Sequence, residues 1–267
     1  MFTVEILSIG NELLIGKIAN TNAQYLARRI VELGGKVIRI VVVGDDLDEI
    51  ASAVRESLQR KPSFIITTGG LGPTFDDVTL AGIGRALGLE IVLNEEALKM
   101  VKEKYEALSK ERGTILELTP ARVKMAMLPK NAEPIRNPVG TAPAVKLKTD
   151  STVIYALPGV PNEMKAIFEE YIAPILAEIS DRVFLERYLF IEGLPESSLA
   201  PILEEAMATY PHIYVKSHPR MEEGRSHIEL HITIYSESKD KAESILSAAT
   251  EYLKKTIEEK GGIISER

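Results

Sequence analysis

The chain has 267 residues, of which 45% are hydrophobic and 27% charged, and its formal net charge is −7. This length accommodates two domains with a sizeable core. No apolar run approaches the roughly 20 residues that a membrane helix needs. The absence of cysteine excludes disulfides and thiolate zinc sites. The net negative charge argues against a general nucleic-acid binder. The N-terminal residues lack the basic start of a signal peptide, so we expect a cytoplasmic protein.

Residues 1–178 are expected to form an α/β domain, because apolar strands alternate with amphipathic helices. Predicted strands cover residues 3–9, 36–44, 63–68 and 152–157, and predicted helices cover residues 21–35, 45–61, 76–88 and 94–112. The turn PGVPNEM opens a last helix, with Pro161 in its first turn, that ends at about Ile179. Thr21 is the expected N-cap of the first helix. The order is typical of a doubly wound, mostly parallel sheet whose continuously apolar strands are covered on both faces. The stretch 128–147, with four prolines, is expected to be irregular.

Residues 179–267 are expected to form a small α+β domain with an antiparallel sheet. Predicted strands cover residues 182–193, 212–218 and 226–236, and predicted helices cover residues 195–210 and 239–262. In the last strand Ile228, Leu230 and Ile232 alternate with polar residues, which predicts one solvated sheet face. Residues 176–267 carry a net charge of −6, from 11 basic and 17 acidic side chains.

The segment TTGGLGPTFDD, Thr67–Asp77, lies between a predicted strand and a predicted helix. Ligands of open α/β sheets bind outside the carboxyl ends of the strands. Glycine there lets backbone N–H groups approach an anion, and the helix N-terminus adds positive potential. The predicted phosphate-binding residues of this turn are Thr68, Gly69, Gly70 and Gly72. The alternative is a tight turn that needs glycine only for its backbone geometry.

Two aspartates end this turn, and two more follow the second strand. Asp76 and Asp77 are either helix caps or ligands of a Mg²⁺-like cation that bridges them to a phosphate. Asp45 and Asp46 reach the same edge of the sheet, where they either cap the next helix or join the site. The predicted metal ligands are Asp76 and Asp77.

Three further loops supply candidates. GNELLIGKIANTN follows the first strand and offers Glu12, as a general base or metal ligand, and Lys17, as a phosphate partner or a plain surface lysine. The loops NPVGTAPA and LPGVPNEM are rich in glycine and proline, which either present rigid backbone donors or simply mark turns. The ligand-binding residues predicted in these two loops are Asn137, Gly140, Thr141, Pro158 and Gly159.

The four histidines all lie in the second predicted domain. His227 and His231 share a strand face with Glu229, which is either a metal site or, as we expect, a solvated face. The basic patch KSHPRMEEGR, residues 216–225, is expected to be a loop, with an arm that reaches a phosphate in a neighbouring subunit as the alternative.

Five segments together resemble one family: GNELLIGKIANTN, TTGGLGPTFDDVT, NPVGTAPA, LPGVPNEM and YVKSHPR. They resemble the amino-terminal part of competence/damage-inducible proteins of the CinA type. That part is a molybdopterin-binding-like domain related to the Mog and MoaB group, followed by a KH-like α+β domain. The resemblance implies a three-layer α/β/α sandwich with strand order 2-1-3 at its core and a pocket at the glycine-rich turn. It also implies that Asp45 and Asp77 are the functional acids and that the protein is a homodimer.

The activity that the resemblance implies is divalent-metal-dependent hydrolysis of a nucleotide pyrophosphate, ADP-ribose or FAD, with Mg²⁺, Mn²⁺ or Co²⁺. Asp77, Asp45 and Glu12 are then the expected catalytic residues. The alternative is a module that binds molybdopterin or a related phosphorylated ligand without turnover. Bacterial members carry a further nicotinamide mononucleotide deamidase domain that this chain lacks, so deamidase activity is not expected. RNA binding is disfavoured by the charge of the second domain, which has the wrong sign.

Overall fold

The computed structural model describes residues 1–222 and 225–265, with no account of the side chains between 220 and 226. The chain forms two compact units. The first comprises residues 1–31 and 35–179, and the second comprises residues 32–34 and 180–267. Among the described residues, no helix is long and apolar enough to cross a membrane.

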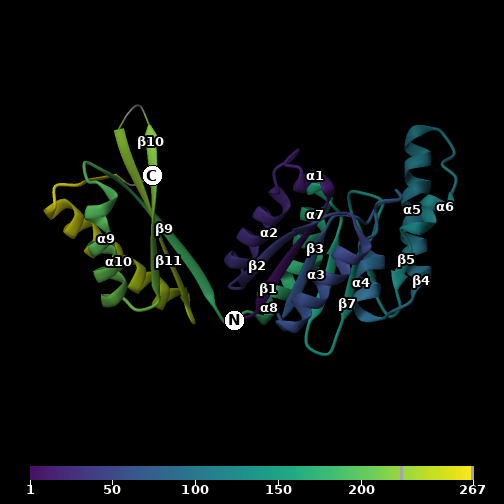
Figure 1. The fold of residues 1–267 in the computed structure, drawn as a ribbon, viewed down its shortest axis with the longest axis horizontal. Helices are drawn as coiled ribbons and strands as arrows, with labels where there is room; N and C mark the ends of the chain where they lie inside the picture. The colour runs from purple at the N-terminus through teal and green to yellow at the C-terminus, as the bar shows by residue number, and fades with distance from the viewer. Residues whose placement is uncertain (223–224, 266–267) are drawn as a thin grey trace. The chain divides into compact units, whose positions relative to one another are not determined.

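The first unit is built on a six-stranded mixed sheet in the order β2-β1-β3-β8-β7-β6 (Figure 1). Its strands are β1 (Thr3–Ile9), β2 (Lys36–Val43), β3 (Phe64–Thr68), β6 (Glu133–Ile135), β7 (Ala144–Lys148) and β8 (Val153–Leu157). β2, β1, β3 and β8 run parallel, whereas β7 and β6 are antiparallel to their neighbours. The predicted α/β fold with a mostly parallel sheet and a 2-1-3 core is therefore confirmed.

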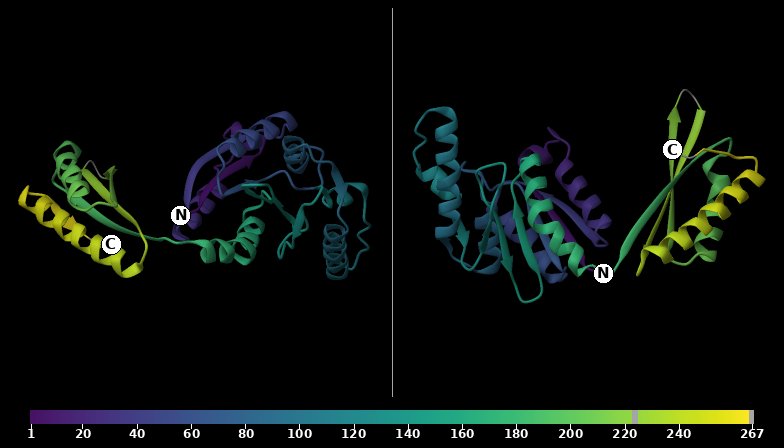
Figure 2. Two further views of the ribbon diagram at one scale, coloured as in Figure 1. Left: turned by 90° about the horizontal axis from the view of Figure 1, so that it is seen from below. Right: turned by 180° about the vertical axis from the view of Figure 1, so that it is seen from behind.

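Helices cover both faces of this sheet (Figures 1 and 2). They are α1 (Asn11–Leu14), α2 (Thr21–Glu32), α3 (Leu47–Gln59), α4 (Thr79–Leu87), α5 (Glu95–Arg112), α6 (Pro120–Lys124), α7 (Pro161–Ile167), the π-helical turn η1 (Phe168–Ile172) and α8 (Ala173–Ile179). Leu7 and Ile65 pack in one core with Ile83 of α4. Val4 and Ile6 alternate with Leu7 along β1 and are fully buried as well, so the second face is also covered.

Two expectations for this unit are wrong. The second strand is not covered on both faces, because β2 is an edge strand in which Ile38 and Ile40 remain 40% and 46% exposed. The stretch 128–147 is not irregular, because it contains β6, β7 and part of β5 (Met127–Pro129), which pairs with β4 (Ile91–Leu93). Strands of three residues are too short to leave a periodic pattern in the sequence.

The start of α2 differs in detail from its prediction. The amide oxygen of Asn20 accepts the backbone N–H of Ala23 at 3.1 Å. Asn20 therefore caps this helix, while Thr21 is its first residue.

The second unit is a four-stranded antiparallel sheet in the order β10-β11-β9-β12, packed against two helices. Its elements are β9 (Val183–Glu192), α9 (Glu196–Thr209), β10 (Ile213–Glu222), β11 (Arg225–Ser236), α10 (Lys239–Glu259) and β12 (Ile263–Ser265). The additional α+β domain is thus present, and its KH-like character stays a prediction. The segment 216–222 belongs to β10, so its expectation as a loop is wrong.

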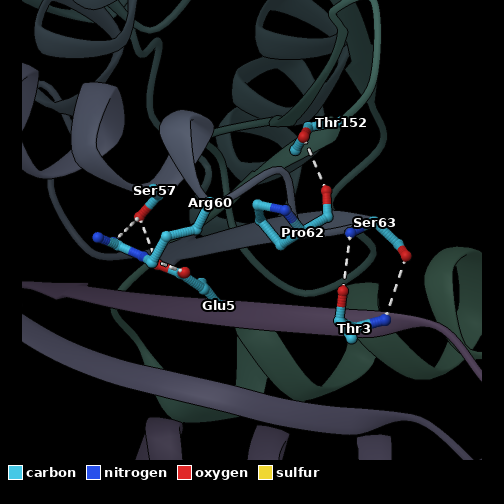
Figure 3. A network of polar contacts seen from close by, with 7 residues as sticks. All are labelled: Thr3, Glu5, Ser57, Arg60, Pro62, Ser63 and Thr152. Atoms are coloured by element: carbon cyan, nitrogen blue, oxygen red, sulfur yellow. Dashed lines mark hydrogen bonds and ion pairs between the residues drawn. The ribbon is translucent and has the colours of Figure 1, made fainter.

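A polar network anchors the amino end of the parallel strands (Figure 3). The fully buried carboxylate of Glu5 accepts hydrogen bonds from Ser57 Oγ at 2.7 Å and from Arg60 Nε at 2.6 Å. Thr152 Oγ1 donates to the carbonyl of Pro62 at 2.7 Å. These bonds tie β1 to the end of α3, and the start of β3 to the start of β8, at the end of the sheet opposite the loops predicted to bind ligand.

Candidate functional site

A cavity of about 380 Å³ lies at the carboxyl ends of β1, β3 and β8. The helices α1 and α7 lie at this edge of the sheet (Figure 1). We call this cavity the main cavity. Its volume is typical of a small-molecule site. The predicted site residues that line it are Glu12, Asp45, Gly69, Gly70, Gly72, Asp76, Asp77, Thr141, Pro158 and Gly159. The topology brings these residues together because the loops that follow parallel strands meet at one edge of the sheet.

Backbone geometry requires glycine at the start of the turn. Gly69 and Gly70 have φ angles of 111° and 66°. A Cβ on Gly69 would stand 2.1 Å from the carbonyl oxygen of Ile9, and one on Gly70 would stand 2.2 Å from Thr79 Oγ1. The tight-turn interpretation is therefore correct for both residues.

The same turn also leaves donors unused. Within the described residues, the backbone N–H groups of Gly70, Leu71 and Gly72 donate to no protein acceptor. An unpaired N–H group at a cavity is available to a ligand oxygen. The turn thus satisfies its geometric requirement and still has unpaired backbone N–H groups in the lining of the main cavity.

Asp76 and Asp77 are not helix caps, because α4 begins at Thr79 without a side-chain cap. Asp77 Oδ2 accepts the backbone N–H of Thr74 at 2.8 Å and the Thr74 hydroxyl at 2.6 Å. The hydroxyl also contacts Asp76 Oδ1. This hydrogen bond lowers the pKa of Asp76, and the positive charge of Lys124 lowers it further. Both carboxylates are therefore held on one turn by Thr74.

Asp45 and Asp46 have different roles although they are neighbours. Asp46 caps α3 by accepting the N–H groups of Asp48 and Glu49 at 2.8 and 3.0 Å. Asp45 instead lines the main cavity and accepts the N–H of Asn11 at 2.8 Å. Asp46 is therefore a helix cap, whereas Asp45 lies at the main cavity.

The carboxylates of the main cavity repel one another. Burial raises the pKa of Asp45, the N–H of Asn11 opposes that rise, and the charges of Glu12, Asp76 and Asp77 add to it. No Lys, Arg or His lines the cavity, while Lys124 lies just outside and contacts the carbonyl of Thr74. The cavity therefore carries a negative charge that no lining side chain neutralises.

These residues fit a hard divalent cation that shares its ligands with a substrate. Among the described side chains, no group of three or more His, Asp or Glu is arranged as a complete metal cage. Mg²⁺ commonly binds one or two carboxylates and completes its shell with water and phosphate oxygens. Asp76 and Asp77, with Asp45 and Glu12 beside them, are the residues that would hold it.

Four predicted ligand residues do not line the main cavity: Lys17, Thr68, Asn137 and Gly140. Asn137 is buried, with its amide holding its own loop: Nδ2 donates to Ala142 O at 2.9 Å, and Oδ1 accepts the N–H of Gly140 at 2.7 Å. Thr68 Oγ1 donates to the carbonyl of Pro158 at 3.1 Å. Lys17 is exposed and does not line the main cavity.

A smaller cavity of about 80 Å³ adjoins the main one through Ile9, Glu12 and Gly159. Thr68 and Asn22 line it, and Asn22 Nδ2 donates to Thr68 Oγ1 at 2.9 Å and to Gly159 O at 2.7 Å. Thr68 therefore faces this smaller cavity and supports the loop after β8.

Two residues of the site escaped the sequence analysis. Glu163, in the first turn of α7, lines the main cavity and was hidden within the motif LPGVPNEM, which we interpreted through its glycine and prolines. Lys124 comes from α6, about fifty positions after the turn that it contacts, so no local pattern indicates it.

His218, His227 and His231 lie in the sheet of the second unit, and His212 lies in the turn before β10. The His231 ring stacks on Tyr188 with ring centroids 4.6 Å apart, and its Nε2 contacts Glu186 Oε2 at 2.8 Å. His227 Nδ1 lies 3.2 Å from Glu192 Oε1. The side chains of His227 and His231 are 29% and 27% exposed, and each lies beside an acidic side chain.

Comparison with known proteins assigns the family. Residues 5–178 match the family model described as a probable molybdopterin binding domain. A protein of Pyrobaculum aerophilum is 47% identical over 260 residues, covering 96% of this chain and 95% of its own length. One of Aeropyrum pernix is 44% identical over 263 residues, covering 98% and 96%.

A crystal structure from Thermoplasma acidophilum, described as the protein CinA with unknown function, has 40% sequence identity and a TM-score of 0.57. The similarity covers 62% of this chain and 94% of that one. The chain therefore belongs to the family of the probable molybdopterin binding domain. Within it, the resemblance to the amino-terminal part of the CinA type is confirmed.

Proposed function

We propose that this protein hydrolyses a nucleotide pyrophosphate of the ADP-ribose or FAD type with the help of a divalent metal ion. One observation carries the proposal: a main cavity that combines unused backbone N–H donors with Asp45 and three further carboxylates whose charges act on it. The N–H groups favour phosphate, whereas the carboxylates repel it. A divalent cation between the two reconciles them, because it binds both carboxylate and phosphate oxygens.

Each wall of the cavity then has a task. When bound, the cation supplies positive charge that neutralises the phosphate oxygens. The N–H groups of Gly70, Leu71 and Gly72 bind one phosphate, and the loop at Thr141 lies where the second would be. The turn at Thr74 holds Asp76 and Asp77 in place, so little conformational entropy is lost in positioning them when the substrate binds.

The proposed reaction consumes one water. Its oxygen attacks one phosphorus, the bond from that phosphorus to the bridging oxygen breaks, and the bridging oxygen leaves with the second phosphate. Glu12 or Asp45 accepts the proton of the attacking water. From ADP-ribose the products are AMP and ribose 5-phosphate.

The test is a chromatographic assay of ADP-ribose and FAD with Mg²⁺, Mn²⁺ and Co²⁺ in turn and with EDTA as the control. We expect AMP to form with at least one metal and to be lost in EDTA. Absence of AMP with every metal and both substrates would contradict the proposal.

Asp77→Asn tests the role of the turn. We expect turnover to fall about 10²–10³-fold, the size of losing one group that stabilises charge in the transition state. The melting temperature should stay near that of the wild type, because the amide oxygen can still accept the Thr74 N–H. Asp150→Asn, an exposed aspartate in the turn between β7 and β8, is the matched control and should keep full activity. Equal activity of both variants would show that Asp77 has no role in the reaction.

The family description favours a second candidate, binding of a molybdopterin-type ligand without turnover. The same N–H groups would hold its phosphate. Calorimetric titration separates the two candidates. Stoichiometric binding of a phosphorylated pterin, together with no AMP from either nucleotide, would favour the binding module.

A further inference from the structure

Glu163 lines the main cavity but has no role in the chemistry proposed above. It lies in the first turn of α7, directly after the loop that follows β8. Its Oε2 accepts a hydrogen bond from Asn137 Nδ2 at 2.7 Å. This bond joins α7 to the loop of residues 137–142, which forms one wall of the cavity.

The partner of Glu163 is rigid. Asn137 is only 7% exposed, and its amide also binds Ala142 O at 2.9 Å, Val139 N at 3.1 Å and Gly140 N at 2.7 Å. A Cβ on Gly140 would stand 2.0 Å from the carboxyl carbon of Glu163, so the loop backbone packs directly on the carboxylate. Glu163 is therefore held in one orientation before any ligand arrives, which lowers the entropic cost of binding.

Glu163 is held by a different loop from the acids that would hold a cation. The charges that act most strongly on Asp45 are those of Glu12, Asp76 and Asp77. Glu163 is instead fixed by Asn137 and Gly140, next to Thr141. Its Oε1 has no protein partner among the described residues.

A fixed carboxylate with a free oxygen accepts hydrogen bonds from the donors of a ligand. It repels phosphate oxygens, so a phosphorylated ligand must turn another part toward it. The hydroxyls of ribose are such donors, and carboxylates bind them in other nucleotide sites. In a nucleotide pyrophosphate, ribose is also the group directly attached to the phosphates, as the position beside the phosphate walls requires.

We propose that Glu163 binds the ribose hydroxyls of the ligand and thereby selects ribose over deoxyribose esters. This inference rests on the proposed function, because it takes the ligand to be a ribose phosphate. Glu163 acts here as a binding residue and not in the bond-breaking step.

The test measures binding by calorimetry in Mg²⁺, without turnover. The ligands are AMP, 2′-deoxy-AMP and 3′-deoxy-AMP, and ribose 5-phosphate with 2-deoxyribose 5-phosphate. We expect the wild type to bind at least one ribose ester roughly 10–100-fold more tightly than its deoxy counterpart, the range for a hydrogen bond to a charged group. In Glu163→Gln this gap should shrink to about threefold or less, because the ribose ester loses affinity while the deoxy ester does not.

Two controls isolate the effect. Glutamine keeps an oxygen for Asn137, so Glu163→Gln should melt like the wild type, and Glu163→Ala repeats the test without any acceptor. Glu178→Gln, on the exposed side of α8, should leave the gap unchanged.

Two results would overturn the inference. The first is wild-type binding that is equal for all ribose and deoxyribose pairs, or that is undetectable for every ester. The second is a Glu163→Gln variant that loses affinity for Mn²⁺ alone, which would make Glu163 a metal ligand. Turnover of ADP-ribose with no ribose preference would overturn this inference and leave the proposed function standing. A ribose preference without turnover would contradict the proposed function and leave the role of Glu163 as a ribose-binding residue standing.

Discussion

The two ends of the parallel strands in the first unit use acidic residues in opposite ways. At the amino end, the buried carboxylate of Glu5 is surrounded by donors from Arg60 and Ser57 (Figure 3). At the carboxyl end, Asp45 receives one backbone N–H and otherwise faces like charges. The amino end supplies its acid with three hydrogen bonds and a cation, whereas the carboxyl end supplies Asp45 with one hydrogen bond and no cation among the residues that act on it.

The difference separates stability from function. Burial alone would raise the pKa of Glu5, but the hydrogen bonds and charge of Arg60 and the bond from Ser57 outweigh it, so the pKa of Glu5 is lowered. The pKa of Asp45 is raised. Folding therefore favours the ionised form of Glu5 and disfavours that of Asp45. Repulsion that persists in a folded protein is typical of a site that waits for a ligand.

Breaking the amino end should give the largest effect on stability. Arg60→Met leaves the fully buried Glu5 without its cation, which should cost about 3–5 kcal/mol of unfolding free energy. Glu5→Gln should cost less, about 1–3 kcal/mol, because the guanidinium of Arg60 is partly exposed and can turn to water. Urea denaturation at pH 7 measures both.

The order of these two variants is the informative result. Arg55→Met, an exposed arginine on the same helix, is the matched control and should change the unfolding free energy by less than about 0.5 kcal/mol. If Glu5→Gln proves more costly than Arg60→Met, the carboxylate does not depend on its cation and the comparison of the two ends loses its basis.

Acid should remove part of the same stabilisation. The pKa of Glu5 is lower in the folded state than its ordinary value of 4.5. Its contribution is therefore fully present above pH 4.5 and is lost as the pH falls through the folded-state pKa. The difference in melting temperature between wild type and Glu5→Gln should be constant from pH 7 to pH 5.5 and should narrow below about pH 4. A difference that widens on acidification would show that the sign is wrong.

Most of the fold followed from local patterns. Long apolar strands and amphipathic helices of ten or more residues, such as β1 and α3, gave the alternation that specifies a parallel sheet. The three-residue strands β4, β5 and β6 could not be predicted from local patterns, because their pairing is decided by partners distant in the chain. The exposure of β2 was not predicted, because the apolar sequence of a strand does not show whether the strand lies at the edge of the sheet.

The candidate site was also predicted only in part. The loops after β1, β3 and β8 could be brought together from topology alone, and the cavity contains residues from all three. The sequence could not show which polar atoms the protein itself consumes. Asn137 and Glu163 illustrate this, because the amide that we expected at the ligand instead holds the carboxylate that we overlooked.

The smallest predicted effect lies at the carboxyl end, and its sign is the opposite of that for Glu5. Asp45→Asn keeps an oxygen for the N–H of Asn11 and removes one charge from the acids around it. In EDTA and low salt we expect stabilisation by a few tenths to about 1 kcal/mol, and the gain should shrink as salt screens the charges. The neighbouring Asp46→Asn should show no such gain, because asparagine caps α3 as well as aspartate does.

Added Mg²⁺ sharpens this contrast between adjacent aspartates. If the acids of the main cavity bind the cation together, Mg²⁺ should raise the melting temperature of the wild type and of Asp46→Asn, but that of Asp45→Asn by less. Destabilisation by Asp45→Asn in EDTA would mean that the carboxylate serves the fold, as Glu5 does. The two ends of the sheet would then not differ in kind, and the repulsion on which the metal proposal depends would have to be attributed to Asp76 and Asp77 alone.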